Sequence, residues 1–139
     1  MSKEPKPVRK LSGGCLCGAV RFHIEGTMRD ILFCHCSMCR LSHGHAAAYT
    51  GVKQADLTFE DESKLTWYRS SDVARRGFCS VCGGRLFYHQ HESPFIGVAA
   101  GSLDQPTDLG AIGHIFTDDA ADYYTIPADE KQWPGEPSR

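Results

Sequence analysis

The chain has 139 residues and a formal net charge of −2, a length typical of one domain and a charge that predicts no broad surface for nucleic acid. Its seven cysteines are an odd number, which excludes a complete set of disulfides within one chain. Metal-bound thiolates in a reducing cytoplasm are therefore the simplest expectation. No apolar run approaches the roughly 20 residues of a membrane span, and the first ten residues lack the apolar stretch of a secretory signal.

Short apolar or alternating segments separated by turns predict a mainly β domain of about eight to ten strands. The clearest case is the alternation of Val20, Phe22 and Ile24 with polar residues. The other expected strands cover residues 31–33, 46–52, 57–59, 65–68, 74–78, 86–88, 95–100 and 112–116. Charge and proline predict a flexible arm at residues 1–10, and proline and glycine predict a frayed tail at 129–139. The folded domain is thus expected to span residues 11–128.

Two short cysteine pairs predict a closed metal site. Cys15 and Cys17 form C-x-C, whereas Cys79 and Cys82 form C-x-x-C, with glycines beside both pairs. Four thiolates from two such knuckles complete a tetrahedral zinc site of the structural kind. The alternative is a set of buried free cysteines. Gly18, directly after the first pair, is expected to adopt a positive φ that lets the knuckle turn back.

The remaining cysteines predict an open site. Cys34, Cys36 and Cys39 fall within six residues, so one tight turn can direct three sulfurs at a single metal ion. Three protein ligands leave one coordination position open, which is typical of catalytic rather than structural zinc. Two alternatives remain: a redox disulfide through Cys36 and Cys39, and an exchange of ligands between the two cysteine groups.

Histidines and arginines near the cysteines are further candidates. His35 lies between two candidate ligands and is placed to donate a hydrogen bond to a thiolate or a bound ligand, while His43 and His45 are candidate fourth ligands. His89 and His91 are expected to be exposed. Arg75 and Arg76 are more typical of a solvated pair, but either one is able to clamp the carboxylate of a substrate.

Three cysteine motifs together resemble those of one known family. The motifs are Gly14-Cys15-Leu16-Cys17-Gly18-Ala19-Val20-Arg21-Phe22, Cys34-His35-Cys36-Ser37-Met38-Cys39-Arg40 and Arg76-Gly77-Phe78-Cys79-Ser80-Val81-Cys82-Gly83. The resemblance extends to Gly101-Ser102-Leu103-Asp104 and His114-Ile115-Phe116. All seven cysteines match in order and spacing those of the glutathione-dependent formaldehyde-activating enzyme family, which includes centromere protein V. The resemblance covers roughly residues 11–126. Tyr123 and Tyr124 depart from it, standing where the family usually has a tryptophan.

The resemblance implies a β-tent fold with two zinc ions per chain. It assigns Cys15, Cys17, Cys79 and Cys82 to a structural zinc and Cys34, Cys36 and Cys39 to a catalytic zinc. The implied activity is that of a carbon–sulfur lyase, which joins glutathione to formaldehyde or a related small aldehyde as S-hydroxymethylglutathione. Zinc bound by three thiolates is a weak Lewis acid but a good partner for a soft fourth ligand such as a substrate thiol.

A second interpretation is that the protein has no enzymatic activity. In that case the second zinc would only stabilise a β surface that docks a protein partner. An exposed apolar patch would favour this binding module, whereas a concave pocket at the three-cysteine group would favour the enzyme.

Overall fold

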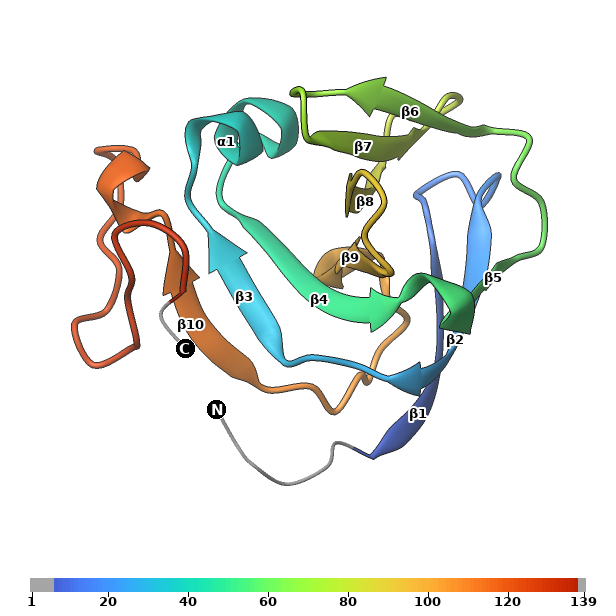
Figure 1. The fold of residues 1–139 in the computed structure, drawn as a ribbon, viewed down its shortest axis with the longest axis horizontal. Helices are drawn as coiled ribbons and strands as arrows, with labels where there is room; N and C mark the ends of the chain where they lie inside the picture. The colour runs from blue at the N-terminus through green and yellow to red at the C-terminus, as the bar shows by residue number, and fades with distance from the viewer. Residues whose placement is uncertain (1–6, 138–139) are drawn as a thin grey trace.

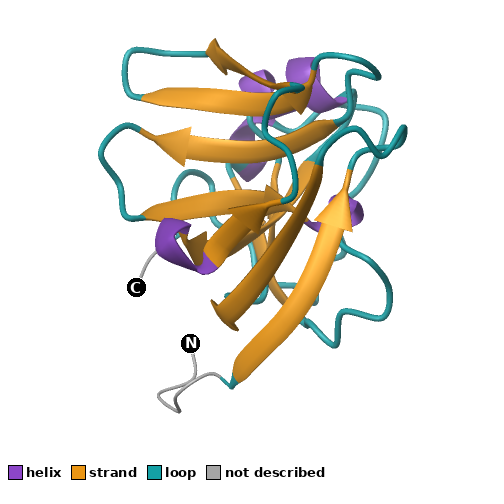
Figure 2. Ribbon diagram, turned by 90° about the vertical axis from the view of Figure 1, so that its right-hand side faces the viewer, coloured by secondary structure: helices purple, strands orange, loops and turns teal. Residues whose placement is uncertain are grey.

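The computed structural model describes residues 7–137, and most of their ordered backbone is β-strand (Figures 1 and 2). The smaller sheet has the order β1-β2-β5 and the larger one the order β10-β3-β4-β9-β8-β7-β6. The ten strands are β1 Val8–Gly14, β2 Arg21–Thr27, β3 Ile31–Cys34, β4 Ala47–Lys53, β5 Leu57–Phe59, β6 Leu65–Arg69, β7 Ala74–Cys79, β8 Arg85–Gln90, β9 Phe95–Ala99 and β10 Ala111–Ile115. All pairings are antiparallel except that of β10 with β3. The mainly β prediction is confirmed.

Helices contribute little to the described part of the chain. The one α-helix among residues 7–137, α1 at Ser37–His43, directly follows the second cysteine of the central motif. Short 3-10 turns occupy Gln54–Asp56, Ala100–Ser102 and Thr117–Asp119. None of the described helices has the length and hydropathy that a membrane crossing would require.

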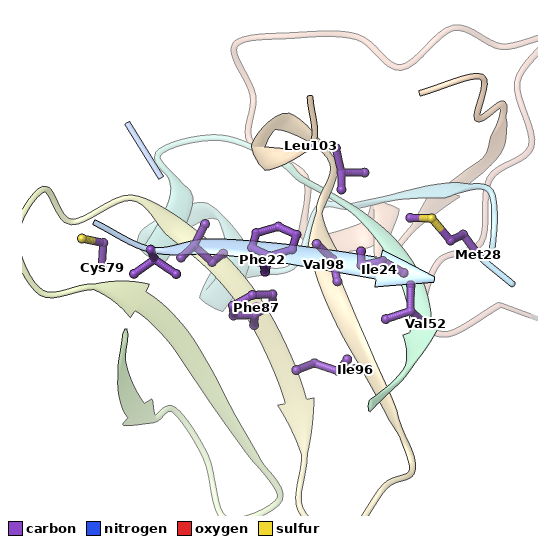
Figure 3. Close-up of a cluster of buried hydrophobic side chains, with 11 residues drawn as sticks. Phe22, Ile24, Met28, Val52, Cys79, Phe87, Ile96, Val98 and Leu103 are labelled. Carbon is purple, nitrogen blue, oxygen red and sulfur yellow. The ribbon is translucent and has the colours of Figure 1, made fainter. Parts of the chain in front are cut away.

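The main core lies between the two sheets. Phe22 and Ile24, on the inward face of β2, are 0% and 1% exposed. Figure 3 shows Phe22 above Phe87 of β8, with Val98 of β9 between Phe22 and Ile24, and Phe22 meets the ring of Phe87 edge to face at a centroid distance of 5.2 Å. The alternation predicted for residues 20–24 is thus the pattern of a strand that buries every second side chain.

The N-terminal boundary of the domain was predicted too late in the chain. Strand β1 begins at Val8 and pairs with β2 along its whole length, from Val8 opposite Thr27 to Gly14 opposite Arg21. This strand is stabilised by its pairing with β2 rather than by the local preference of its residues. Its composition, charged and preceded by prolines, therefore indicated a flexible arm. Residues 1–6 of the predicted arm lie outside the described residues.

The prediction of a frayed C-terminal tail was wrong for residues 131–135. The backbone of His114 in β10 donates to the carbonyl of Lys131 at 2.8 Å and accepts from the amide of Trp133 at 2.9 Å. The amide of Phe116 in turn donates to Gly135 at 2.8 Å. This C-terminal segment covers the edge of the larger sheet beside β10, so it satisfies backbone groups that would otherwise be unpaired.

The close approach of this segment to Gly113 can be tested with a matched pair of variants. A Cβ at Gly113 would lie 2.6 Å from the carbonyl oxygen of Lys131, whereas a Cβ at Gly110 would meet nothing nearer than 3.8 Å. We expect Gly113→Ala to lower the free energy of unfolding by about 1–3 kcal/mol and to speed trypsin cleavage at Lys131, because the segment must move away. Gly110→Ala should stay within about 0.5 kcal/mol of the wild type. Equal trypsin sensitivity in the two variants would contradict the docking of the segment.

Candidate metal centres and their surroundings

Four cysteines meet where the smaller sheet joins the larger one. Cys15 and Cys17 follow β1, Cys79 ends β7, and Cys82 lies in the turn to β8. Their four sulfurs lie within 4.8 Å of one another, with 3.6 Å between Cys15 and Cys17 and 3.8 Å between Cys17 and Cys79. Zinc–sulfur bonds of about 2.3 Å in a tetrahedron put sulfurs about 3.8 Å apart. The group therefore fits a closed zinc site, in which all four ligands come from the chain.

The backbone around this group favours thiolates. The amides of Val20 and Val81 donate to the sulfurs of Cys15 and Cys79, each at 3.3 Å. Backbone hydrogen bonds from Cys17 and Gly84 lower the pKa of Cys82 to about 6. Gly18 has the predicted positive φ of 78°, which turns the chain so that the amide of Val20 can reach back to Cys15.

The three other cysteines form a separate group at the far end of β3. Cys34 ends that strand, Cys36 is the N-cap of α1, and Cys39 lies in its first turn. The three sulfurs lie within 4.8 Å of one another, and the sulfur of Cys36 accepts the amide of Cys39 at 3.2 Å. The division of the seven cysteines into four and three is thus confirmed, and both groups could hold a metal ion. All seven are free of disulfides.

The thiols of the three-cysteine group differ in acidity. Hydrogen bonds with Cys34 and then Cys39 hold the pKa of Cys36 far below its ordinary value. Hydrogen bonds with Cys36 and Cys39, together with burial, raise the pKa of Cys34. The group therefore favours at least one thiolate before any cation binds, and a bound cation would favour deprotonation of the others.

Arg76 supplies a buried positive charge beside these sulfurs. Its side chain is 6% exposed, and Nη1 and Nη2 both donate to Cys39 Sγ at 3.7 Å. The guanidinium also lies 5.0 Å from the ring of Tyr88. Burial alone would lower the pKa of Arg76, but the charge of Cys39 and the hydrogen bonds to it raise the pKa above its ordinary value. Arg76 is thus a partner of the three-cysteine group rather than a solvated residue.

Arg75 lies on the opposite face of β7. Its guanidinium stacks 4.0 Å from the ring centroid of Trp67, and Nε donates to His89 Nδ1 at 3.4 Å. Since neighbouring residues of a strand point to opposite faces, the pair could have been separated from the sequence alone. The structure therefore brings only Arg76 to the three-cysteine group. His89 is 6% exposed, contrary to its predicted exposure. It lies opposite Arg75 in the sheet, accepts from that arginine through Nδ1, and donates from Nε2 to the carbonyl of Ser93 at 2.9 Å.

Neither of the two histidines predicted as a fourth ligand, His43 and His45, joins the three-cysteine group. Within the described residues, the group of possible metal ligands that contains Cys34 has only Cys36 and Cys39 as further members. His43 pairs with the hydroxyl of Tyr49 at 2.7 Å, and His45 pairs with that of Tyr123 at 2.6 Å. Burial, followed by the charges of Arg76 and Arg85, lowers the pKa of His43 to about 4, which keeps its imidazole neutral at pH 7.

His35 lies in a chain of hydrogen bonds that sequence analysis did not find. It contacts the hydroxyl of Tyr124 through Nδ1, and its Nε2 lies 2.8 Å from His114 Nδ1. His114 Nε2 lies 2.8 Å from the carboxylate of Glu130. A carboxylate only accepts, so with neutral rings His114 donates to Glu130, His35 donates to His114, and Tyr124 donates to His35. Neither nitrogen of His35 is left for a cysteine sulfur.

Comparison with known proteins gives the family. A family model described as glutathione-dependent formaldehyde-activating enzyme matches residues 10–119. The chain belongs to this family. The match includes all seven cysteines and Arg76, and it ends before Tyr124 and Glu130. Tyr124 and Glu130 complete the hydrogen bonds of His35 and His114. Both therefore lie outside the part of this protein that the family model covers.

Two relatives place the chain more broadly. A protein of Schizosaccharomyces pombe (strain 972 / ATCC 24843), named as an uncharacterized lyase, is 31% identical over 78 residues, or 55% of each chain. The chain thus spans about half the length of that curated relative. A crystal structure of a Rhodobacter sphaeroides protein has a TM-score of 0.57 and 28% sequence identity, covering 68% of this chain and 88% of the other.

Two adjacent tyrosines provide a test of the histidine chain. Tyr124 bonds to His35, which is 3% exposed, whereas Tyr123 is 61% exposed and bonds to the exposed His45. We expect Tyr124→Phe to lower the free energy of unfolding by about 1–3 kcal/mol, because the buried Nδ1 of His35 loses its partner. Tyr123→Phe should change it by no more than about 0.5 kcal/mol. Denaturant melts of both variants measure the difference. Equal free energies of unfolding would show that the hydrogen bonds of His35 do not stabilise the site.

Proposed function

We propose that this protein is a zinc-dependent carbon–sulfur lyase that adds a small thiol such as glutathione to formaldehyde or a related small aldehyde. In this reaction the sulfur–carbon bond forms, the carbonyl π bond breaks to leave a C–O single bond, and the thiol proton ends on that oxygen. The namesake activity of the family and the name of the yeast relative support this class of reaction. The choice of glutathione and formaldehyde as substrates is part of the proposal.

The observation that carries the proposal is a group of three sulfurs that could hold a cation, with no fourth ligand among the described residues. When bound there by Cys34, Cys36 and Cys39, zinc would offer a position for one further soft ligand, and a substrate thiolate is such a ligand. Arg76 stabilises negative charge at this group through its two bonds to Cys39. A further anionic sulfur can therefore approach at a lower electrostatic cost.

The alternative of a binding module has one observation in its favour. Several apolar side chains are exposed near the cysteine groups: Leu16, Val81, Met38 and Leu41. Single exposed apolar residues are common on monomers, however, and do not by themselves mark an interface. Ala47 and Ala99 line a cavity of about 320 Å³ and pack in the same buried group as Cys34 and Cys39, and such a hollow favours the enzyme.

A thiol-binding experiment separates the two functions. We expect the zinc-loaded protein to bind glutathione and to bind S-methylglutathione at least tenfold more weakly, because only the former can become a thiolate. A free thiol has a pKa of about 8.5, so the fraction of thiolate, and with it the apparent affinity, should rise between about pH 6 and 8.5 and then level off.

Calorimetry at two pH values within that range measures both effects. The exchange rate of ¹³C-formaldehyde with its glutathione adduct, followed by NMR, then reports the reaction itself. Cys36→Ala is the control that should lose thiol binding and the rate enhancement together. Equal affinity for glutathione and its S-methyl form, at both pH values, would contradict the proposed function and favour the binding module.

A further inference from the structure

The histidine chain crosses three neighbouring segments at the edge of the larger sheet. His35 directly follows β3, and His114 lies in β10, which pairs with β3 and lies beside it in Figure 1. Glu130 directly precedes the C-terminal segment, residues 131–135, which covers the other side of β10. The histidine chain therefore connects this segment to the turn that carries the three-cysteine group.

His35 is the one residue between Cys34 and Cys36, so its conformation bears directly on how these two sulfurs converge. Its amide donates to the carbonyl of Ile115 at 3.0 Å, and its buried ring has a hydrogen-bond partner at each nitrogen. Backbone and side chain are thus both held at the point where the protein leaves a strand and enters a helix.

Glu130 sets the direction in which the histidine chain donates. His114 Nε2 lies 2.8 Å from this carboxylate, which only accepts, so the proton of a neutral His114 stays on Nε2. His114 Nδ1 is then an acceptor, which holds the proton of His35 on its Nε2. Without the carboxylate, both imidazoles are free to carry the proton on Nδ1 instead, and the order of donors and acceptors at His35 is no longer fixed.

We propose that Glu130 is a positioning residue for the three-cysteine group and acts on it through His114 and His35. By fixing the tautomer of both rings, Glu130 holds the turn from Cys34 to Cys36 in the geometry that binds a cation. Hydrogen-bond partners outside the ligands themselves are known to orient metal ligands and to change metal affinity. This inference rests on the zinc binding of the proposed function but not on its substrates.

The rate at which each zinc ion leaves the protein tests this role. A colorimetric zinc chelator should report two phases from the wild type, and Cys36→Ala identifies the phase of the three-cysteine group by losing it. We expect Glu130→Ala to speed that phase about three- to tenfold, which is less than the roughly 10–100-fold effect of a direct partner of a metal ligand. The phase of the four-cysteine group should be unchanged, because no bond of the histidine chain reaches it.

Glu130→Gln separates positioning from charge. Its amide oxygen can still accept from His114 Nε2, so zinc should leave the three-cysteine group at nearly the wild-type rate. Asp129→Ala is the matched control, because Asp129 is an exposed neighbouring carboxylate without an ion pair in residues 7–137. It should also keep the wild-type rate.

Three results would overturn the role of Glu130 and leave the proposed function standing. The first is an equal rate for Glu130→Ala and Asp129→Ala. The second is a Glu130→Gln protein as fast as Glu130→Ala, since charge rather than a hydrogen-bond acceptor would then be responsible. The third is an equal acceleration of both phases, which a general loss of stability would produce. A wild type that binds no zinc at the three-cysteine group would overturn the proposed function, and this inference with it.

Discussion

The contact between the guanidinium of Arg76 and the sulfur of Cys39 is the interaction on which the candidate site depends. Arg76 is nearly inaccessible to water, and in residues 7–137 it has no carboxylate partner. A buried cation without a counter-ion costs several kcal/mol. The negative charge of the thiolates offsets that cost, and three thiolates exceed the charge of Zn²⁺ by one. Arg76 and a loaded three-cysteine group would therefore be neutral together.

This contact also joins elements that are distant in the sequence. Arg76 belongs to β7, which leads into the four-cysteine group at Cys79, whereas Cys39 belongs to α1. In Figure 1, α1 lies beside the β6–β7 end of the larger sheet. Cys79 packs in the main core with Phe22 and Phe87, while Cys34 and Cys39 pack in a smaller buried group with Tyr49. The chain thus separates two candidate metal sites, one packed against the main core and one in the smaller buried group.

The sequence predicts features that depend on local spacing. The division of the cysteines, the alternation of β2 and the positive φ of Gly18 all follow from residues a few positions apart. Features that depend on distant partners were missed. Strand β1 and the segment after Glu130 look disordered in composition but are held by backbone bonds to β2 and β10. Similarly, Tyr124 and His35 are 89 positions apart, and no local pattern predicts their contact.

The most direct test of the two-site account is the number of zinc ions carried by each folded chain, measured by native mass spectrometry. The account predicts two for the wild type, matching its two cysteine groups. Cys36→Ala should carry one zinc ion and stay folded, because the loss is confined to the open site. Cys79→Ala should lose folded protein, since metal binding at a closed site contributes several kcal/mol to folding. A Cys36→Ala protein that keeps both ions, or that unfolds as readily as Cys79→Ala, would contradict the division into a closed and an open site.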